Sequence, residues 1–186
     1  MKKHIHLPIT KEEAAALTAG ESVLLSGIIY TARDAAHKRL IELIESNSPL
    51  PFDLNNAAIY YVGPSPAFDK HVIGSAGPTT SSRCDKYTPA LLTHGVTVLV
   101  GKGRRNDDVK NELVRQSAVY LAATGGAGAM LSRCIHSGRM IAFEELGTEA
   151  VRELYIENFP AVVINDAHGN DYYDTARQMY LDSVNK

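Results

Sequence analysis

The chain has 186 residues, of which 45% are hydrophobic and 22% charged, and its formal net charge at pH 7 is -2. This length and composition allow a sizeable core, so we expect residues 1–186 to form one globular α/β domain. The near-neutral charge excludes long-range attraction to nucleic acid or to an anionic membrane, and no apolar run is long enough to span a bilayer. The first residues lack the apolar core of a secretion signal, which favours a cytoplasmic location.

The first part of the chain predicts a helix, a strand and a second helix. A capping box at residues 10–13 marks the start of a short helix. Residues 22–30 are rich in β-branched and apolar side chains, which is typical of a strand. Residues 34–45 repeat apolar side chains at helical spacing. Arg33 and Asp34 therefore stand at a strand-to-helix junction.

The middle of the chain predicts two strands with a helix between them. The strands lie at residues 57–62 and 96–100, and the helix begins at Thr88-Pro89 and stops before Gly95. The second strand is an uninterrupted apolar run, as expected of a buried strand. It delivers Gly101-Lys102-Gly103 to its carboxyl end.

The last part of the chain alternates helix, strand and turn signals. These lie at residues 106–117 (helix), 119–122 (strand), 124–128 (glycine-rich turn), 153–156 and 161–165 (strands) and 166–170 (turn). The glycine-rich turn lacks GxGxxG spacing and no Walker A motif is present, so we interpret this turn as a site of close backbone packing. Because the elements have no regular βαβ rhythm, we expect a mixed sheet core with flanking helices.

The cysteines and histidines argue against a metal site in this chain. Cys84 and Cys134 lie far apart and have no CxxC partner, which also excludes a disulfide framework. The seven histidines form no HExxH or HxxxH pair. We single out His37 and expect the others, His71 among them, to be surface or turn residues.

The most informative stretch is G-P-T-T-S-S-R at residues 77–83, which places four hydroxyls and one guanidinium behind a Gly-Pro turn. Such a turn can aim the following N–H groups at one point, and a short helix beginning near Thr80 or Ser81 would add its own free N–H groups. Arg83 could bind a carboxylate through two parallel hydrogen bonds. The stretch predicts a carboxylate or phosphate site, and the alternative is a capped surface helix with Arg83 in solvent.

Residues 77–83, preceded by Ala32-Arg33-Asp34-Ala35-Ala36-His37 and followed by residues 101–103, resemble the carboxy-terminal catalytic part of the class I fumarases. They are equally similar to the β subunits of two-subunit fumarases and L-tartrate dehydratases. The resemblance covers nearly the whole chain and implies a swivelling β/β/α domain. It also implies the reversible addition of water to a four-carbon dicarboxylate, and a [4Fe-4S] cluster held by a partner α subunit in a dimer of heterodimers.

The resemblance also implies roles for individual residues. Catalytic roles fall to Thr79 and Lys102, substrate binding to Arg33, Arg83, Thr80 and Ser81, and supporting roles behind them to Asp34 and His37. Physical chemistry supports these roles, because two arginines from different loops can fix both ends of a dicarboxylate. A lysine can stabilise charge that develops on a carboxylate when the neighbouring proton is removed.

We expect the chain to be the β subunit of a fumarate hydratase that is active only with its cluster-bearing partner. The enzymatic alternative is an L-tartrate dehydratase β subunit, since both substrates are four-carbon dicarboxylates. An alternative of another class is a non-catalytic module that binds a dicarboxylate or a phosphate.

Overall fold

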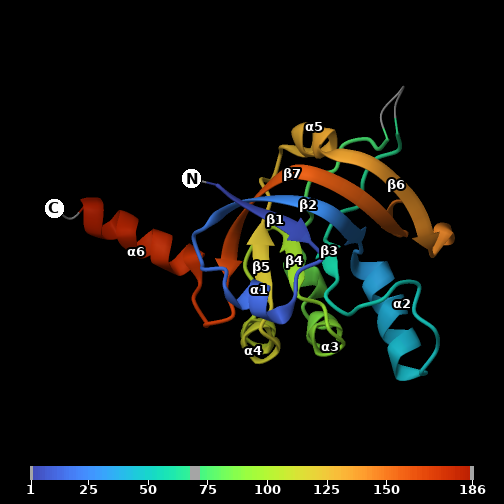
Figure 1. The fold of residues 1–186 in the computed structure, drawn as a ribbon, viewed down its shortest axis with the longest axis horizontal. Coiled ribbons are helices and arrows are strands. Elements are labelled where there is room, and N and C mark those ends of the chain that lie inside the picture. Colours follow the sequence, from blue (N-terminus) through green and yellow to red (C-terminus); the bar gives the residue numbers. More distant parts are fainter. Residues whose placement is uncertain (1, 68–71, 185–186) are drawn as a thin grey trace.

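A computed structural model describes residues 2–67 and 72–184 of the chain (Figure 1). The strands are β1 (Lys3–Leu7), β2 (Ser22–Thr31), β3 (Ala58–Tyr60), β4 (Val98–Gly101), β5 (Val119–Ala122), β6 (Ile135–Ala142) and β7 (Val151–Asn165). The α-helices are α1 (Lys11–Ala15), α2 (Asp34–Glu45), α3 (Thr88–Thr93), α4 (Asp107–Gln116), α5 (Gly128–Leu131) and α6 (Tyr172–Val184). The 3₁₀ helices are η1 (Ser81–Cys84), η2 (Ser132–Cys134) and η3 (Glu144–Glu149). His71 lies outside the described residues.

Strands β2, β3, β4, β5 and β7 form a closed mixed barrel. The pairings β2–β3, β3–β4 and β4–β5 are parallel, and β7 pairs antiparallel with both β5 and β2, which closes the ring. Strand β1 adds to β2 in parallel, and β6 adds to β7 in the antiparallel sense. The expectation of a mixed sheet core with flanking helices is confirmed, with the sheet curled into a barrel.

The core has two parts because successive side chains of a strand point to opposite faces. Tyr60, Val98 and Val100 belong to the cluster that fills the barrel. Ile59 and Leu99, which alternate with them, belong to a second cluster beneath the helices. Figure 1 shows α2, α3 and α4 on one side of the barrel, away from the broad band of β2 and β7.

The parallel strands bring their carboxyl ends to one edge of the barrel. Because β2, β3, β4 and β5 run in the same direction, the loops that follow them meet at that edge. These loops begin after Thr31, Tyr60, Gly101 and Ala122. The topology therefore gathers residues that lie far apart in the sequence.

One sequence prediction is corrected, because β7 is a single strand over Val151–Asn165 and not two shorter ones. Pro160 lies inside this strand although it has no N–H group to donate to a ladder. In the structure Pro160 pairs with Leu24 of β2, while β6 pairs with β7 only up to Ile156 and β5 only from Val162 onward. On the side of β7 away from β2, no strand in the described part of the chain pairs with Pro160, so no hydrogen bond is lost there for want of an N–H group.

The strands β1 and β6 and the helix α6 have no counterpart in the sequence prediction. The side chains of β6 are mostly exposed, so this strand lacks the apolar pattern of a core element. Helix α6 packs on the second cluster through Tyr172 and Tyr173 and then projects away from the barrel (Figure 1). None of the helices in the described ranges is long and apolar enough to cross a membrane.

Candidate active site

The carboxyl-end edge of the barrel carries the residues singled out in the sequence. Arg33 follows β2, Thr79 lies in the long connection after β3, and Lys102 directly follows β4. The glycine-rich turn that contains Gly125 follows β5. We refer to this edge as the anion edge, defined by these four residues together with residues 80–83.

Residues 79–81 extend the sheet beside Lys102. The Thr79 N–H donates to the Tyr61 carbonyl oxygen at 2.8 Å, and Thr80 forms an isolated parallel bridge with Lys102. The Ser81 N–H donates to the Lys102 carbonyl oxygen at 3.0 Å. Thr79 is half-buried and Thr80 exposed, so backbone bonds hold both residues in place and Thr80 faces solvent.

The short helix expected near residue 80 is present as the 3₁₀ helix η1. Its first residue, Ser81, is buried, and its third, Arg83, is exposed. The Arg83 side chain is therefore accessible from solvent. Four residues make only about one turn of 3₁₀ helix, so η1 adds few free N–H groups.

The glycine-rich turn lies directly against the anion edge, and its expected close packing is confirmed. The Ala76 N–H donates to the Gly128 carbonyl oxygen at 3.1 Å, and a Cβ on Gly77 would lie 3.4 Å from the Gly128 Cα. A Cβ on Gly125 would lie 3.4 Å from Cδ and 3.8 Å from Nζ of Lys102. The Lys102 side chain thus extends over Gly125, and the turn is both a packing element and a neighbour of the ammonium group.

Arg33 is the N-cap residue of α2 and its guanidinium is held on two sides. Nη2 lies 3.6 Å from Oε1 of Glu149, whose other carboxylate oxygen accepts the Ala35 N–H at 2.9 Å. A Cβ on Gly63 would overlap the Arg33 side chain. Sequence reasoning missed Glu149, because it lies far from Arg33 in the sequence and is brought near it only by the packing of η3 against α2. An acidic group beside the first turn of a helix also favours that helix.

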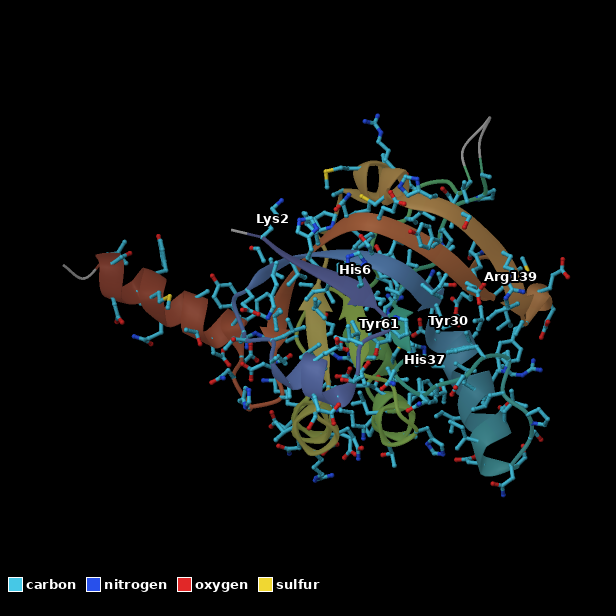
Figure 2. The ribbon with its side chains drawn as sticks, viewed as in Figure 1. Lys2, His6, Tyr30, His37, Tyr61 and Arg139 are labelled. Atoms are coloured by element: carbon cyan, nitrogen blue, oxygen red, sulfur yellow. The ribbon has the colours of Figure 1, made fainter. Side chains whose placement is uncertain are left out.

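His37 is fully buried one turn into α2, and Figure 2 shows it beside Tyr61 between the barrel and the helices. Its ring centroid lies 5.1 Å from that of Tyr61 and 6.4 Å from that of Tyr87. Nδ1 lies 2.9 Å from the Arg33 carbonyl oxygen, which can only accept, so Nδ1 carries the proton. Burial, with a contribution from the Arg105 charge, lowers the pKa of His37 to about 4. The neutral ring therefore holds the backbone of Arg33 in place. Because the ring is fully buried, its effect on a ligand is indirect, through Arg33.

Asp34 and Arg33 lie close to η1. The pKa of the Cys84 thiol is raised to about 12, mainly by burial and then by the Asp34 charge, while Arg33 acts in the opposite sense. Helix α2, which Arg33 caps, contacts η1, which contains Arg83, so the two arginines lie on neighbouring elements. Their charges come from separate loops, as binding of a two-ended anion requires.

Sequence reasoning also missed a buried cation, Arg105, behind the anion edge. Its side chain is fully buried, with Nε 2.7 Å from Asp85 Oδ1 and Nη2 2.8 Å from Thr88 Oγ1. The guanidinium carbon lies 4.9 Å from the ring centres of both Tyr61 and Tyr120. The available signal was two tyrosines within buried strand segments, because buried phenols usually have a polar partner.

This chain offers no ligand set for a metal cluster within residues 2–67 and 72–184. No group of three or more His, Cys, Asp or Glu side chains there could hold a metal ion. Cys84 stays protonated because of its raised pKa, and Cys134 lies half-buried on a different element. An iron–sulfur cubane needs several thiolates, so these residues do not fit one.

Comparisons with known proteins show which family the chain resembles. The family model described as the fumarase C-terminus matches residues 1–176. The chain is 38% identical to a Methanocaldococcus jannaschii protein named "Putative L(+)-tartrate dehydratase subunit beta", over 96% of this chain and 94% of that protein.

Longer proteins match as well. Fumarate hydratase 2 of Leishmania major is 34% identical over 93% of this chain, and the anaerobic class I fumarate hydratase of Escherichia coli is 36% identical over 80% of it. The chain spans 31% and 28% of the length of these two proteins, so it corresponds to a part of each. With a family model that covers nearly its full length, the chain belongs to the fumarase C-terminal domain family.

Proposed function

We propose that residues 1–186 act as the β subunit of a [4Fe-4S]-dependent hydro-lyase that hydrates fumarate reversibly to malate. The observation that carries the proposal is the anion edge itself. Arg33, Thr79 and Lys102 lie in the connections that follow three parallel strands of the barrel, which end at the same edge. The match to the fumarase C-terminus supports a hydro-lyase role for that edge. A four-carbon dicarboxylate is the ligand class that suits several cations around a hydroxyl.

The cations of the anion edge bind and orient the substrate. Arg83 is exposed and so free to make a planar contact with one carboxylate, while Arg33 keeps Glu149 as its partner until a ligand competes for it. Lys102 brings a compact positive charge over Gly125. As the proton next to a carboxylate is removed, negative charge grows on that carboxylate, and a fixed ammonium lowers the barrier by binding it more tightly.

Thr79 is the group we propose for proton transfer. The hydrogen bond from its backbone N–H to the Tyr61 carbonyl oxygen fixes the Cα position of Thr79. Its half-buried side chain has limited contact with water. A threonine hydroxyl is a weak base in water, so its deprotonated form needs the cations of Arg33, Arg83 and Lys102 nearby. Thr80 lies beside it on the exposed side, where its hydroxyl and N–H can complete the carboxylate contacts.

The cluster belongs, in this proposal, to a partner α subunit that also supplies the rest of the substrate site. It would bring a Lewis acid to the substrate hydroxyl, and this chain would bring the cations and the threonine. We further propose the swivelling arrangement of this domain against the partner and a dimer of such pairs. The name of the M. jannaschii relative, a subunit beta, supports the existence of such a partner.

A second candidate is an L-tartrate dehydratase β subunit. The 38% identity over nearly the full length of the M. jannaschii protein favours it. The two substrates share their carboxylates and differ in their hydroxyl groups. Since the cations of the anion edge recognise carboxylates, the choice between the substrates depends on groups that contact hydroxyls.

The test is a steady-state assay of this chain co-expressed with its cluster-bearing partner, under anaerobic conditions, with fumarate, malate and L-tartrate. Turnover of fumarate and malate supports the first proposal, and turnover of tartrate alone supports the second. No turnover of any of the three by a preparation with a full complement of iron and sulfide contradicts both and leaves the non-catalytic module. In a pair that does turn over one of these substrates, Thr79→Ala should lower kcat by roughly 10²–10⁴-fold, and Thr79→Ser should lower it much less.

A further inference from the structure

The Ser81 hydroxyl oxygen accepts its hydrogen bonds from groups within the protein. This atom, Oγ, accepts the Lys102 N–H at 3.1 Å and lies 3.1 Å from the Tyr120 hydroxyl. The same Tyr120 hydroxyl lies 2.9 Å from the Gly103 carbonyl oxygen. Ser81 is fully buried, so solvent does not compete for these contacts.

The Tyr120 hydroxyl is the donor in its contact with Ser81. Burial raises the pKa of Tyr120 well above its ordinary value, so the phenol is protonated and carries one hydrogen. The phenol shares this hydrogen between Ser81 Oγ at 3.1 Å and the Gly103 carbonyl oxygen at 2.9 Å. Ser81 Oγ therefore accepts two hydrogen bonds within the protein, from the Lys102 N–H and from Tyr120, which occupy its two lone pairs. Because the side chain is also fully buried, it does not present its hydroxyl to a ligand in solvent.

Lys102 is clasped on both sides by Ser81. Its N–H donates to Ser81 Oγ, and its carbonyl oxygen accepts the Ser81 N–H at 3.0 Å. The fit is tight, because a Cβ on Gly101 would overlap Ser81 Oγ. The backbone of Lys102 is therefore fixed, while its side chain extends over Gly125 at the anion edge.

Arg105 packs against Tyr120, the residue whose hydroxyl contacts Ser81. Its guanidinium lies between the rings of Tyr61 and Tyr120, 4.9 Å from each ring centre. Asp85 fixes it through Nε at 2.7 Å and is itself fixed by the Asn106 N–H at 2.8 Å. A buried, planar cation between two rings limits how far Tyr120 can move.

We propose that Ser81, Tyr120 and Arg105 form a positioning unit that acts on the substrate through Lys102, so that Ser81 is a clasp for the lysine and does not contact the substrate. This proposal deepens the proposed function and rests on it only for the kinetic readout. It reassigns Ser81 from substrate binding to positioning, and it leaves the substrate contacts to Arg33, Arg83, Thr80 and Lys102.

The kinetic test is a double-mutant cycle in the assembled enzyme, with Ser81→Ala, Tyr120→Phe and the double variant. If both residues act through one clasp, each single variant lowers kcat/KM by about tenfold, and the double variant falls little further. If Ser81 binds substrate on its own, the two effects multiply to about a hundredfold loss. A multiplied loss, or an unchanged kcat/KM in Tyr120→Phe, overturns the proposal.

The matched control is Thr97→Val, which removes a buried hydroxyl bond of similar length at the other end of β4. Thr97 Oγ1 donates to the Ile9 carbonyl oxygen at 2.9 Å, and Thr97 is fully buried. This variant should lower the melting temperature about as much as Ser81→Ala without changing kcat/KM. A comparable loss of kcat/KM in Thr97→Val means that general destabilisation explains the kinetics, and the proposal is then wrong.

A second readout does not depend on activity. Amide hydrogen exchange of the full chain alone should be about tenfold faster at Lys102 in Ser81→Ala, Tyr120→Phe and Arg105→Lys than in the wild type and in Thr97→Val. Unchanged exchange at Lys102 in the first two variants contradicts the clasp. If the wild-type pair turns over none of the dicarboxylates, the proposed function fails, while the exchange data still decide the clasp.

Discussion

Replacement of His37 by phenylalanine isolates the contribution of one buried side chain to the pH dependence of the free energy of unfolding. The variant keeps an aromatic ring beside Tyr61 and Tyr87 but carries no titrating nitrogen. It loses the Nδ1 bond to the Arg33 carbonyl oxygen, which costs about 1 kcal/mol at any pH. This constant cost leaves the pH dependence as the informative quantity.

The magnitude follows from the lowered pKa of His37, which falls from 6.5 to about 4 because the ring is buried. Above pH 6.5 the ring is neutral in both the folded and the unfolded chain, so it contributes nothing to the pH dependence. Between pH 6.5 and 4 the unfolded chain binds a proton that the folded chain rejects, so stability falls as the pH falls. The full difference is ~3 kcal/mol, and about 2.5 kcal/mol of it is lost by pH 4.5.

The assay is urea denaturation of the wild type and His37→Phe at pH 7.5, 6.5, 5.5 and 4.5. The wild type should lose about 2.5 kcal/mol more than the variant between the first and last pH. The carboxylates with lowered pKa values, Glu112 and Asp166 for example, titrate in both proteins and cancel in the comparison. Parallel pH curves for the two proteins would refute the reasoning, because they would mean that His37 takes up its proton as easily when folded.

Three further predictions concern the anion edge and α6. Arg83→Lys should lower kcat/KM of the assembled enzyme by about ten- to a hundredfold, because lysine keeps the charge but loses the planar guanidinium. The control Arg115→Lys, at an exposed arginine, should leave kcat/KM unchanged, and equal effects of the two substitutions would remove Arg83 from the site. Gly63→Ala should raise KM at unchanged urea midpoint because a Cβ there displaces the Arg33 side chain, and an unchanged KM would show that the position of Arg33 does not matter. Truncation after Ala176 should leave the melting temperature of the chain alone within about 2 °C, because every later described residue is exposed, and a drop beyond about 5 °C would mean that α6 stabilises the barrel.

The sequence predicts those parts of the fold that local signals determine. The capping box of α1, the apolar stripe of α2 and the buried run of β4 each carry enough information within a few residues. The single strand β7 and the edge strand β6 were not predictable in this way. Pro160 is tolerated only because of which neighbours β7 has at that point, and the exposed side chains of β6 resemble those of a loop.

The candidate site divides along the same line. Residues 77–83 and Lys102 could be identified as candidates from the sequence alone. Hydroxyls and cations that follow a Gly-Pro turn or a strand indicate an anion site. Glu149 and Arg105 could not be found there. Glu149 meets Arg33 only because η3 packs beside α2, and Arg105 becomes informative only when Tyr61 and Tyr120 are known to enclose it.

The distribution of charge around the anion edge explains why this chain would need a partner to be an enzyme. Arg83 and Thr80 face solvent, where an ion pair with a carboxylate contributes only about 0–1 kcal/mol. Arg105, the cation that is shielded from water, is already neutralised by Asp85 and cannot serve a substrate. The exposed cations gain strength only when another surface excludes water from them, because electrostatic attraction rises as the local dielectric falls. In the proposed function the partner subunit is this covering surface, and the cations of this chain would bind a dicarboxylate more tightly beneath it than in open solvent.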